Sequence, residues 1–273
     1  MGKVILITGA SSGMGKEAAK ALIKQGHTVY TAARRLDSMN DLAQMGGFPI
    51  QMDVSKKEDI ENAVKTIIDK SNKIDILWNN AGFGLFGSVE EISIEEARRQ
   101  FDVNLFGLAA LTQQVIPYMR EAKSGTIINT SSMGGKMYTP LGAWYHATKH
   151  ALEGWSDCLR LELKQFNIHV VILEPGVIST AFGEVLYEPM LKVSGNGPYK
   201  KFAMAVAEAT KNTYSKPNGA SPSSVISDTL VKIVNARQPK TRYRVGKLAK
   251  PLVWMRTYLG DTLFDKIILS QVK

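Results

Sequence analysis

Cysteine, negative charge and long apolar runs are scarce in this sequence. The single cysteine, Cys158, excludes a disulfide within the chain and a metal site built from several thiolates. The first apolar run, Val4-Ile5-Leu6-Ile7, is far too short for a signal-peptide core or a membrane span, and Leu6 stands where a myristoylation signal needs Ser or Thr. We therefore expect a cytoplasmic protein in which Cys158 packs within a helix and has no nucleophilic role.

The scarcity of acidic residues leaves a net charge of +9, from 34 Lys and Arg against 25 Asp and Glu. Such a surplus is typical of proteins that bind nucleic acid, anionic membranes or a phosphorylated small molecule. Because no basic run is dense enough for a nucleic-acid tract, we expect a solvated basic surface and no nucleic-acid partner. The one denser group consists of Lys240, Arg242, Arg244, Lys247, Lys250 and Arg256.

What the sequence does contain is a regular alternation of short β-rich runs with amphipathic helical patterns. The expected strands are Val4–Thr8, Thr28–Ala32, Ile50–Asp53, Ile74–Asn79, Thr126–Thr130 and Val170–Glu174. The expected helices are Gly15–Gln25, Lys56–Lys70, Ile94–Arg120 and Ala143–Phe166. The alternation predicts an α/β fold, in which residues 1–273 form a single domain around a doubly wound parallel sheet. In such a fold, ligands bind beyond the carboxyl ends of the strands.

The pattern weakens after Pro175. Scattered glycines and prolines over residues 176–220 predict a mobile excursion over the sheet, a substrate loop, instead of another βα unit. Ser221-Pro222 is typical of a helix start, with an N-cap followed by proline, and predicts a helix through about Val234. The apolar stretch Leu252–Met255, in an extension over residues 247–273, leaves three interpretations open: peripheral contact with a membrane, a cover over the substrate pocket, or a subunit interface.

The first strand runs directly into Thr8-Gly9-Ala10-Ser11-Ser12-Gly13-Met14-Gly15. Glycines at this place let the backbone turn tightly and approach a pyrophosphate without a Cβ in the way. The helix that follows directs free N–H groups and the positive end of its dipole at the same anion. A dinucleotide site is therefore expected, with contacts from Gly9, Ser11, Ser12, Gly13, Met14 and Gly15.

An NAD site places an acidic residue about 20 positions after the glycine turn, where it binds the ribose hydroxyls. Here Ala33 is followed by Arg34 and Arg35. A guanidinium pairs with a ribose 2′-phosphate, whereas a carboxylate would repel it. The sequence therefore predicts NADP(H) as cofactor, with Arg34 as the main contact and Arg35 as a secondary one, and disfavours an NAD-linked alcohol oxidase.

Tyr145 and Lys149 lie four residues apart in an expected helix, so that their side chains share one face. Ser132 follows the fifth expected strand and lies at the carboxyl edge of the sheet, whereas Asn104 lies on the long helical stretch before that strand. A free phenol titrates near pKa ~10. A nearby ammonium and an oxidised nicotinamide would draw the pKa of Tyr145 toward working pH, which suits a general acid or base.

These motifs, together with Asn79-Asn80-Ala81-Gly82 and Pro175-Gly176, resemble those of the short-chain dehydrogenase/reductase family in order and spacing over residues 3–180. The resemblance implies a Rossmann fold of three αβα layers. It also implies a catalytic set in which Ser132 holds the substrate oxygen, Tyr145 moves the proton, Lys149 binds the nicotinamide ribose and Asn104 anchors a water. The further cofactor contacts that it implies are Asp53, Val54, Asn80, Ala81, Gly82, Pro175, Gly176, Ile178 and Thr180. Asp53 has an alternative interpretation as a helix cap near Ser55.

The chain is most similar in texture to family members that act on hydroxysteroids, retinol and other lipophilic carbonyls. We expect a lipophilic ketone, aldehyde or secondary alcohol as substrate, because the candidate pocket residues are large, apolar and rich in methionine. The expected substrate contacts are Ser132, Met133, Met137, Tyr138, Tyr145, Phe182 and Tyr187. Further candidates are Phe83, Leu85, Trp144, Met190, Tyr199, Phe202 and Met204.

Two further expectations concern partners and metals. The family commonly assembles through the helices that carry Asn104 and Tyr145, so we expect a homodimer or homotetramer. His146 and His150 flank Lys149 without a metal-ligand pattern, so that we interpret them as helix-face residues and expect no metal. A cofactor-binding sensor without turnover remains the alternative from another functional class.

Overall fold

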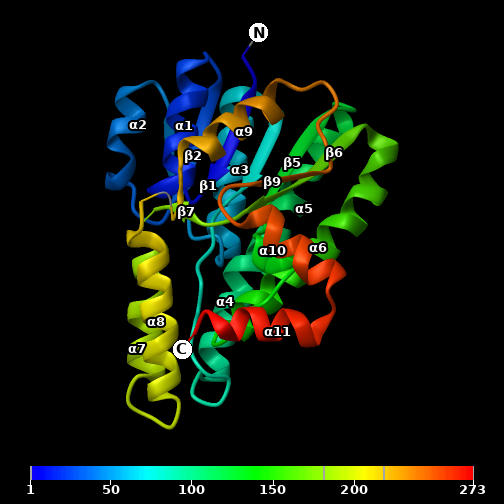
Figure 1. Ribbon diagram of the computed structural model, residues 1–273. Helices are drawn as coiled ribbons and strands as arrows, with labels where there is room; N and C mark the ends of the chain where they lie inside the picture. The colour runs from blue at the N-terminus through cyan, green and yellow to red at the C-terminus, as the bar shows by residue number, and fades with distance from the viewer. Residues whose placement is uncertain (1, 181, 218, 273) are drawn as a thin grey trace.

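A seven-stranded parallel sheet forms the centre of the computed structural model, which describes residues 2–180, 182–217 and 219–272. Its strand order is β3-β2-β1-β4-β5-β6-β9, and every neighbouring pair is parallel. The carboxyl ends of the strands point downward in Figure 1. The strands are β1 (Val4–Thr8), β2 (Thr28–Ala33), β3 (Phe48–Gln51), β4 (Ile76–Asn79), β5 (Gly125–Thr130), β6 (Ile168–Pro175) and β9 (Arg242–Val245).

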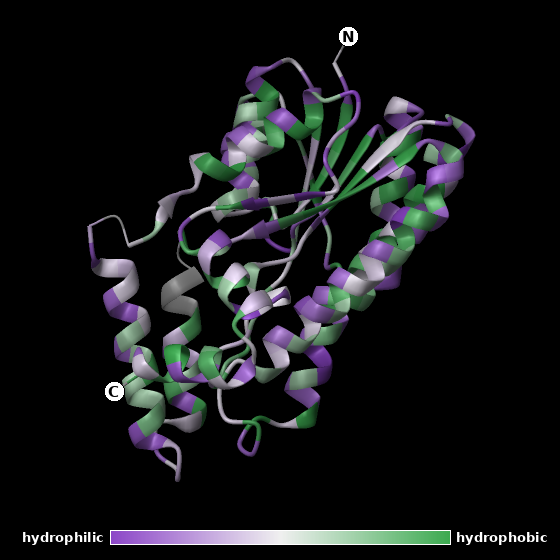
Figure 2. Cartoon of the chain, turned by 45° about the vertical axis from the view of Figure 1, so that its right-hand side comes forward, coloured by the Kyte–Doolittle hydropathy of each residue, from purple (hydrophilic) through white to green (hydrophobic). Residues whose placement is uncertain are grey.

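Helices cover both faces of the sheet, because successive side chains of each buried strand point to opposite faces. In β1, Val4 and Leu6 pack with α3 (Lys57–Ser71), α5 (Leu108–Glu121) and α6 (Ala143–Leu163). Ile5 and Ile7 point the other way, toward a second group of helices. This group consists of α1 (Gly13–Lys24), α2 (Asn40–Gln44) and α9 (Ser224–Asn235). The predicted doubly wound sheet is confirmed, and Figure 2 shows its apolar strands between helices of mixed hydropathy.

The expected long helix over residues 94–120 is interrupted. It consists of α4 (Ile94–Phe101), a π-helix η2 (Asp102–Gly107) and α5. Ser93 and Glu96 form a capping box that starts α4. The wide turn of a π-helix shifts the register of the side chains after it, and such turns occur often at functional sites. Asn104 lies inside this turn.

The excursion expected over residues 176–220 is a helical hairpin, which corrects the prediction of an irregular segment. Its helices are α7 (Phe182–Ser194) and α8 (Lys200–Ser215), which pack together through Met190, Val206 and Ala207. Phe86 and Leu141 from the body of the protein pack against the same cluster. Apolar burial therefore orders a segment whose glycines and prolines suggested a loop.

The expected helix start at Ser221-Pro222 is wrong. These two residues form β8, which pairs with β7 (Ile178–Ser179), and α9 begins only at Ser224. The reason is a backbone hydrogen bond from the N–H of Ser221 to the carbonyl of Val177, at 2.9 Å, which commits this segment to an extended conformation.

The C-terminal segment adds a strand and two helices that the sequence did not reveal. Arg242 and Arg244 of β9 pair with the fully buried carboxylate of Glu174 on β6, and Arg242 also contacts Glu153 on α6 at 3.1 Å. Part of the basic group therefore neutralises buried acids instead of forming a solvated surface. Cys158, expected to be packed, is exposed on α6.

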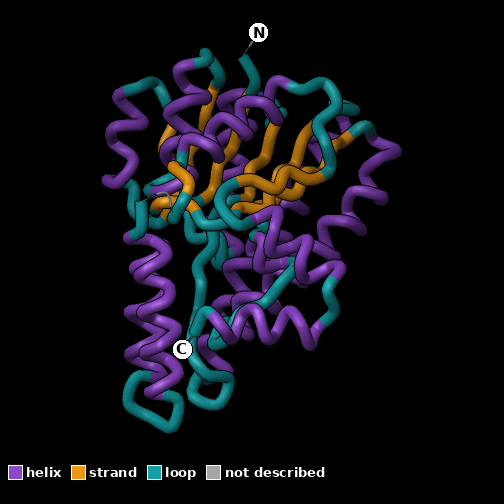
Figure 3. The backbone as a smooth tube through the Cα atoms, in the orientation of Figure 1, coloured by secondary structure: helices purple, strands orange, loops and turns teal. Residues whose placement is uncertain are grey.

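The last two helices, α10 (Ala249–Tyr258) and α11 (Asp261–Ser270), pack on the loop after Ser132. Val253 and Phe264 contribute buried side chains to this cluster, together with Met137. We call α7, α8, α10 and α11 the helical cover, since they lie beyond the carboxyl edge of the sheet (Figure 3). Within the described residues, no helix is both long and apolar enough to span a membrane.

Candidate active site

The turn between β1 and α1 is built to bring its backbone close to a ligand. Gly9 and Gly13 have backbone φ angles of +67° and +53°, which residues with a Cβ rarely adopt. A Cβ on Gly15 would lie 2.5 Å from the carbonyl oxygen of Gly9, so that only glycine fits there. Ser12 makes no side-chain cap on α1, and no acidic residue occupies its first turn. The positive end of the helix therefore faces Ser11–Met14 without a competing carboxylate.

The segment after β4 is bonded to this glycine turn. The backbone N–H groups of Asn80 and Ala81 donate to the Thr8 hydroxyl at 3.0 and 2.9 Å, and the Asn80 side-chain amide donates to the Thr8 carbonyl at 3.1 Å. Thr8 is itself buried. The amide oxygen of Asn80 is buried without a hydrogen-bond partner among the described residues. Asn80 and Ala81 thus lie beside Gly9.

The segment after β6 reaches the same place from the other side. A Cβ on Gly176 would lie 2.1 Å from the Lys247 carbonyl oxygen, so Gly176 allows Pro175–Ile178 to pass against the C-terminal segment. Ile178 is buried in β7. Beyond it, the Thr180 methyl lies 3.7 Å from the position of a Cβ on Gly13. The structure therefore brings Thr180 to the glycine turn.

Arg34 and Arg35 are exposed directly after β2, on the same edge of the sheet. Asp53 lies nearby, after β3, and its carboxylate accepts from the N–H and the hydroxyl of Ser55 at 3.0 and 2.7 Å. Partial burial opposes ionisation of Asp53, but the hydrogen bonds from Ser55 and the charge of Arg34 outweigh it and lower the pKa. Asp53 is not the cap of α3, whose N-cap is Lys56.

Val54, the other residue expected near the adenine, is buried. Its carbonyl oxygen lies only 2.1 Å from the position of a Cβ on Gly107. Gly107, at the end of the π-helix, thus lets this helix pack closely against the loop that follows β3.

Ser132 and Tyr145 are joined by a hydrogen bond between their side chains. The Ser132 hydroxyl also accepts from the Gly134 N–H at 3.0 Å, which leaves its own proton to be donated to the phenol. Burial raises the pKa of Tyr145 to about 12, against the effect of Ser132, and Tyr214 on α8 adds to the rise. The sequence predicted a lowered pKa for Tyr145, and this prediction is wrong for the protein without its cofactor. Burial has the largest effect on the pKa, so the phenol keeps its proton.

Lys149 and Asn104 converge beside Gly82. The Lys149 ammonium donates to the Thr130 carbonyl at 2.8 Å, and burial lowers the pKa of Lys149 to about 8, while Glu153 acts in the opposite direction. The Asn104 amide accepts from and donates to the backbone of Phe83, at 3.1 and 2.9 Å. A Cβ on Gly82 would lie 3.0 Å from the Asn104 Oδ1 and 3.8 Å from the Lys149 Nζ. The four expected catalytic residues thus lie at one edge of the sheet.

The expected substrate contacts divide between two parts of the helical cover. Met133 and Met137 pack with α10 and α11, and the Tyr138 hydroxyl donates to Asp265 at 2.9 Å. Tyr187 packs with Met190 in the α7–α8 cluster. The side chain of Phe182 lies outside the described residues. Met204 is 54% exposed on α8, and its role as a substrate contact stays a prediction.

Sequence reasoning missed three aromatic neighbours of Tyr145. The Phe86 ring lies 5.5 Å from the Tyr145 ring, and the His146 ring lies 5.6 Å from it. Tyr214, on α8, lies close enough to interact electrostatically with Tyr145. Phe86 directly follows the pocket candidate Leu85 and was within reach of the same argument, whereas nothing local in the sequence places α8 near α6.

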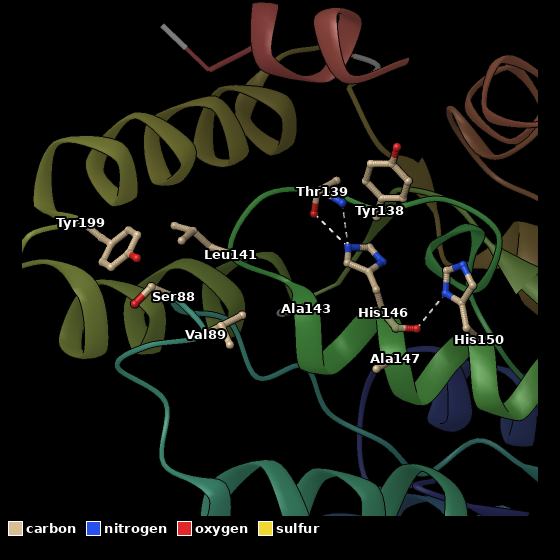
Figure 4. A pocket seen from close by; sticks show the side chains of 10 residues that line it. All are labelled: Ser88, Val89, Tyr138, Thr139, Leu141, Ala143, His146, Ala147, His150 and Tyr199. Atoms are coloured by element: carbon tan, nitrogen blue, oxygen red, sulfur yellow. Dashed lines mark hydrogen bonds between the residues drawn. The ribbon is translucent and has the colours of Figure 1, made fainter. Parts of the chain in front are cut away.

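A cavity of about 540 Å³ lies beside this site (Figure 4). Among the described residues, Ala143, His146, Ala147 and His150 of α6 line one side, and Tyr199, from the α7–α8 connection, lines another. Ser88, Val89 and the segment from Tyr138 to Leu141 complete the lining. The cavity borders His146 and is adjacent to the Ser132–Tyr145 pair without containing it. No metal-ligand cluster occurs within the described ranges.

A family model described as short chain dehydrogenase matches residues 3–190. The chain belongs to the short-chain dehydrogenase/reductase family. It is 36% identical to a 3-ketodihydrosphingosine reductase of Bacteroides thetaiotaomicron over 96% of this chain and 95% of that one. It is 33% identical to a probable short-chain type dehydrogenase/reductase of Helicobacter pylori, over 96% and 95%.

Solved structures of other proteins have a fold similar to that of this short-chain dehydrogenase/reductase. A short-chain dehydrogenase from Streptomyces avermitilis is 29% identical, with a TM-score of 0.78 over 98% of this chain and 97% of that chain. The closed form of a serine dehydrogenase complexed with NADP+ is 27% identical, with a TM-score of 0.78 over 90% and 96%.

The residues present in this short-chain dehydrogenase/reductase fit the nicotinamide cofactor that the family uses. Gly15 leaves a cradle that a Cβ would fill, the first turn of α1 has no acidic residue, and the unpartnered Asn80 oxygen lies beside the turn. These features suit a pyrophosphate and an adjacent ribose. The chain is therefore an oxidoreductase of small molecules with a nicotinamide-type site.

Proposed function

We propose that this oxidoreductase uses NADPH to reduce a lipophilic ketone or aldehyde to the alcohol, and catalyses the reverse reaction with NADP+. The observation that carries the proposal is the buried Tyr145 phenol, hydrogen-bonded to Ser132, with Lys149 one helical turn away. This group lies at the carboxyl edge of the sheet, where the glycine turn, Gly82 and Thr180 also meet. A doubly wound sheet binds its ligands at this edge.

The roles of the residues follow from their protonation states. NADPH, when bound, would supply the hydride that the carbonyl carbon needs. Tyr145 gives its proton to the carbonyl oxygen, and a pKa of about 12 keeps that proton in place until transfer. Ser132 donates a hydrogen bond that stabilises negative charge on the oxygen. Lys149, charged below its pKa of about 8, stabilises the phenolate that remains and holds the cofactor ribose, while Asn104 shapes the path by which the proton returns.

The preference for NADPH rests on Arg34 and Arg35, the two exposed guanidinium groups after β2. Fluorescence titration of Arg34→Ala should show NADPH binding weakened about 10–100-fold, with NADH binding nearly unchanged. Arg35→Ala is the matched control and should lose less. Equal losses for both cofactors would contradict the assignment, and tighter binding of NADH by the wild type would reverse it.

The preference for a lipophilic substrate rests on the apolar clusters of the helical cover, to which Met133, Met137 and Tyr187 belong. The relative from Bacteroides thetaiotaomicron is named for reduction of a sphingoid ketone, which agrees with an apolar substrate. We expect 2-tetradecanone to be reduced with a kcat/KM at least tenfold above that of 2-butanone, since each buried methylene adds about 0.8 kcal/mol. Equal values for the two ketones would contradict a lipophilic site.

Tyr145→Phe separates an enzyme from a cofactor-binding sensor. The ring still packs, but no proton is available, so kcat should fall by about 10²–10⁴-fold. The Kd for NADPH should stay within a factor of two. Unchanged turnover would exclude Tyr145 as the proton donor, and an absence of turnover in the wild type across ketones and aldehydes would support the sensor.

Oligomer formation through α5 and α6 belongs to the same proposal. Phe106, Tyr118 and Leu161 are exposed on η2, α5 and α6, with 59%, 36% and 71% of each side chain accessible. Contiguous exposed apolar patches mark interaction surfaces, and we expect these three residues to contribute to one. Light scattering on wild type and Leu161→Glu should show a dimer or tetramer that dissociates in the variant.

A further inference from the structure

His146 follows Tyr145 on α6, and none of the roles described above uses it. Its side chain is only 7% exposed. Its Nδ1 lies 2.9 Å from the Gly134 carbonyl oxygen. Its Nε2 lies 3.0 Å from the Thr139 backbone nitrogen and 2.9 Å from the Thr139 hydroxyl, and Figure 4 shows these two contacts with Thr139. Both ring nitrogens are therefore bonded to the loop that begins at Ser132.

The hydrogen bonds define one tautomer of this ring. The backbone N–H of Thr139 can only donate, so Nε2 accepts. A neutral imidazole then carries its proton on Nδ1 and donates it to Gly134. Burial, opposed by the hydrogen bond to Gly134 and aided by the neighbouring His150, lowers the pKa of His146 to about 4, so that the ring is neutral at neutral pH.

The bond to Gly134 closes a ring of contacts around the proposed proton donor. The carbonyl of Gly134 is held by His146, and its N–H donates to the Ser132 hydroxyl at 3.0 Å. Ser132 in turn is hydrogen-bonded to Tyr145, which is joined to His146 by a peptide bond. Gly134 is thus held at its N–H by Ser132 and at its carbonyl by His146, next to the two side chains that must meet the substrate oxygen.

Close packing confines the imidazole on the sides that face Gly134, Gly142 and Phe86. A Cβ on Gly134 would lie 2.9 Å from its Nδ1, and a Cβ on Gly142 would lie 2.8 Å from its Cδ2. Phe86 covers the ring edge-on, with the two centroids 6.3 Å apart. A ring that is confined on all these sides transmits its position to the groups that it bonds.

We propose that His146 is a positioning residue: its Nδ1–H holds the Gly134 peptide and thereby sets the placement of Ser132 against Tyr145, while its Nε2 holds the far end of the loop at Thr139. The inference rests on the proposed function, because Ser132 and Tyr145 are its output. The two nitrogens have separable effects, since Gly134 adjoins the reacting groups and Thr139 adjoins the cavity.

Three substitutions separate the two nitrogens. His146→Asn keeps a donor near Nδ1, His146→Gln keeps an acceptor near Nε2, and His146→Phe keeps only the ring. In turnover of a ketone that the wild type reduces, with active sites counted by NADPH titration, we expect kcat to fall about 10–100-fold in His146→Phe and His146→Gln. His146→Asn should retain kcat within about threefold and raise KM. The Kd for NADPH should be unchanged in all three.

Equal kcat losses in all three variants would reduce His146 to a folding role, and an unchanged kcat in a folded His146→Phe would overturn the proposal. A second readout is independent of turnover. The ¹⁵N spectrum of histidine-labelled protein at neutral pH should show a proton on Nδ1 of His146, and a proton on Nε2 or a charged ring would refute the inference. If the wild type were inactive but gave the expected spectrum, the proposed function would be rejected. The hydrogen bonds of His146 to Gly134 and Thr139 would still stand.

Discussion

The glycine turn at residues 8–15 and the helical cover meet at the same edge of the sheet, but they are held in different ways. The turn is held by backbone approaches, such as the 2.5 Å that a Cβ on Gly15 would leave to the Gly9 oxygen. The cover is held by apolar side chains, among them Met190, Val206 and Phe264. A backbone cradle tolerates no added atom, whereas an apolar cluster tolerates exchanges that conserve volume. Under the proposed function, the cofactor side is therefore fixed, and the substrate side is free to vary.

The most severe test of this difference is Gly15→Ala. The added methyl group clashes with the Gly9 carbonyl and the Asn80 amide, so NADPH binding should weaken about 10–100-fold, with a loss of stability of about 1–3 kcal/mol. The matched control is Gly154→Ala on α6, where a Cβ meets nothing within 4 Å. That change should leave binding unchanged and add up to about 1 kcal/mol of stability. Similar results for both glycines would remove the distinction between the two regions.

The pH dependence of reduction tests the border between the regions, where Lys149 lies. Because burial lowers its pKa to about 8, Lys149 is charged below that pH and neutral above it. The kcat for reduction should therefore fall by up to about tenfold per pH unit above pH 8. Lys149→Arg keeps its charge throughout this range and should remove the fall, at a lower absolute rate. A flat wild-type profile up to pH 10 would exclude this role for the ammonium.

A cavity in the cover should affect substrate and stability but not cofactor. Met190 is 2% exposed, and Met190→Ala should lower the free energy of unfolding by about 2–4 kcal/mol and raise KM. The control on the same hairpin is Met204→Ala, where 54% exposure limits the change to about 0.5 kcal/mol. Chemical denaturation measures the free energy of unfolding, and NADPH titration measures the Kd for the cofactor. Weaker NADPH binding in Met190→Ala would show that the two regions are coupled.

The smallest effect is expected at the edge of the cover. Tyr138→Phe removes the hydrogen bond to Asp265 but keeps the ring, which lies 5.2 Å from the Phe264 ring. Because this hydrogen bond is exposed, the free energy of unfolding should change by less than about 1 kcal/mol. Asp265→Asn should give a similar value in thermal denaturation, and a loss of several kcal/mol in either variant would show that polar contacts hold the cover.

The same division explains what the sequence could predict. The glycine turn and the Tyr145–Lys149 spacing are local patterns, so their residues are found together as expected. The strand Arg242–Val245 escaped detection because two arginines in four residues do not resemble a buried strand; their charges are matched by Glu174 and Glu153, which lie far away in sequence. The hairpin of α7 and α8 escaped because its helices are ordered by distant partners such as Phe86.

Other differences come from geometry that sequence does not encode locally. The π-helix at Asp102–Gly107 ends where Gly107 closely approaches the Val54 carbonyl, a contact between separate elements. The pKa of Tyr145 rises because the folded chain buries it, and burial by α8 is invisible in the spacing of motifs. Local rules therefore predict which residues gather, and tertiary packing sets their protonation.

The pairing of Glu174 with β9 has a consequence for the order in which the protein is made. The carboxylate of Glu174 is fully buried, and its ion-pair partners, Arg242 and Arg244, come much later in the chain. During synthesis, the strands up to β6 leave the ribosome with this carboxylate unpaired, and a buried unpaired charge is strongly unfavourable. The sheet is thus completed only when its last strand emerges, so that a nascent chain stalled before Arg242 stays open at that edge.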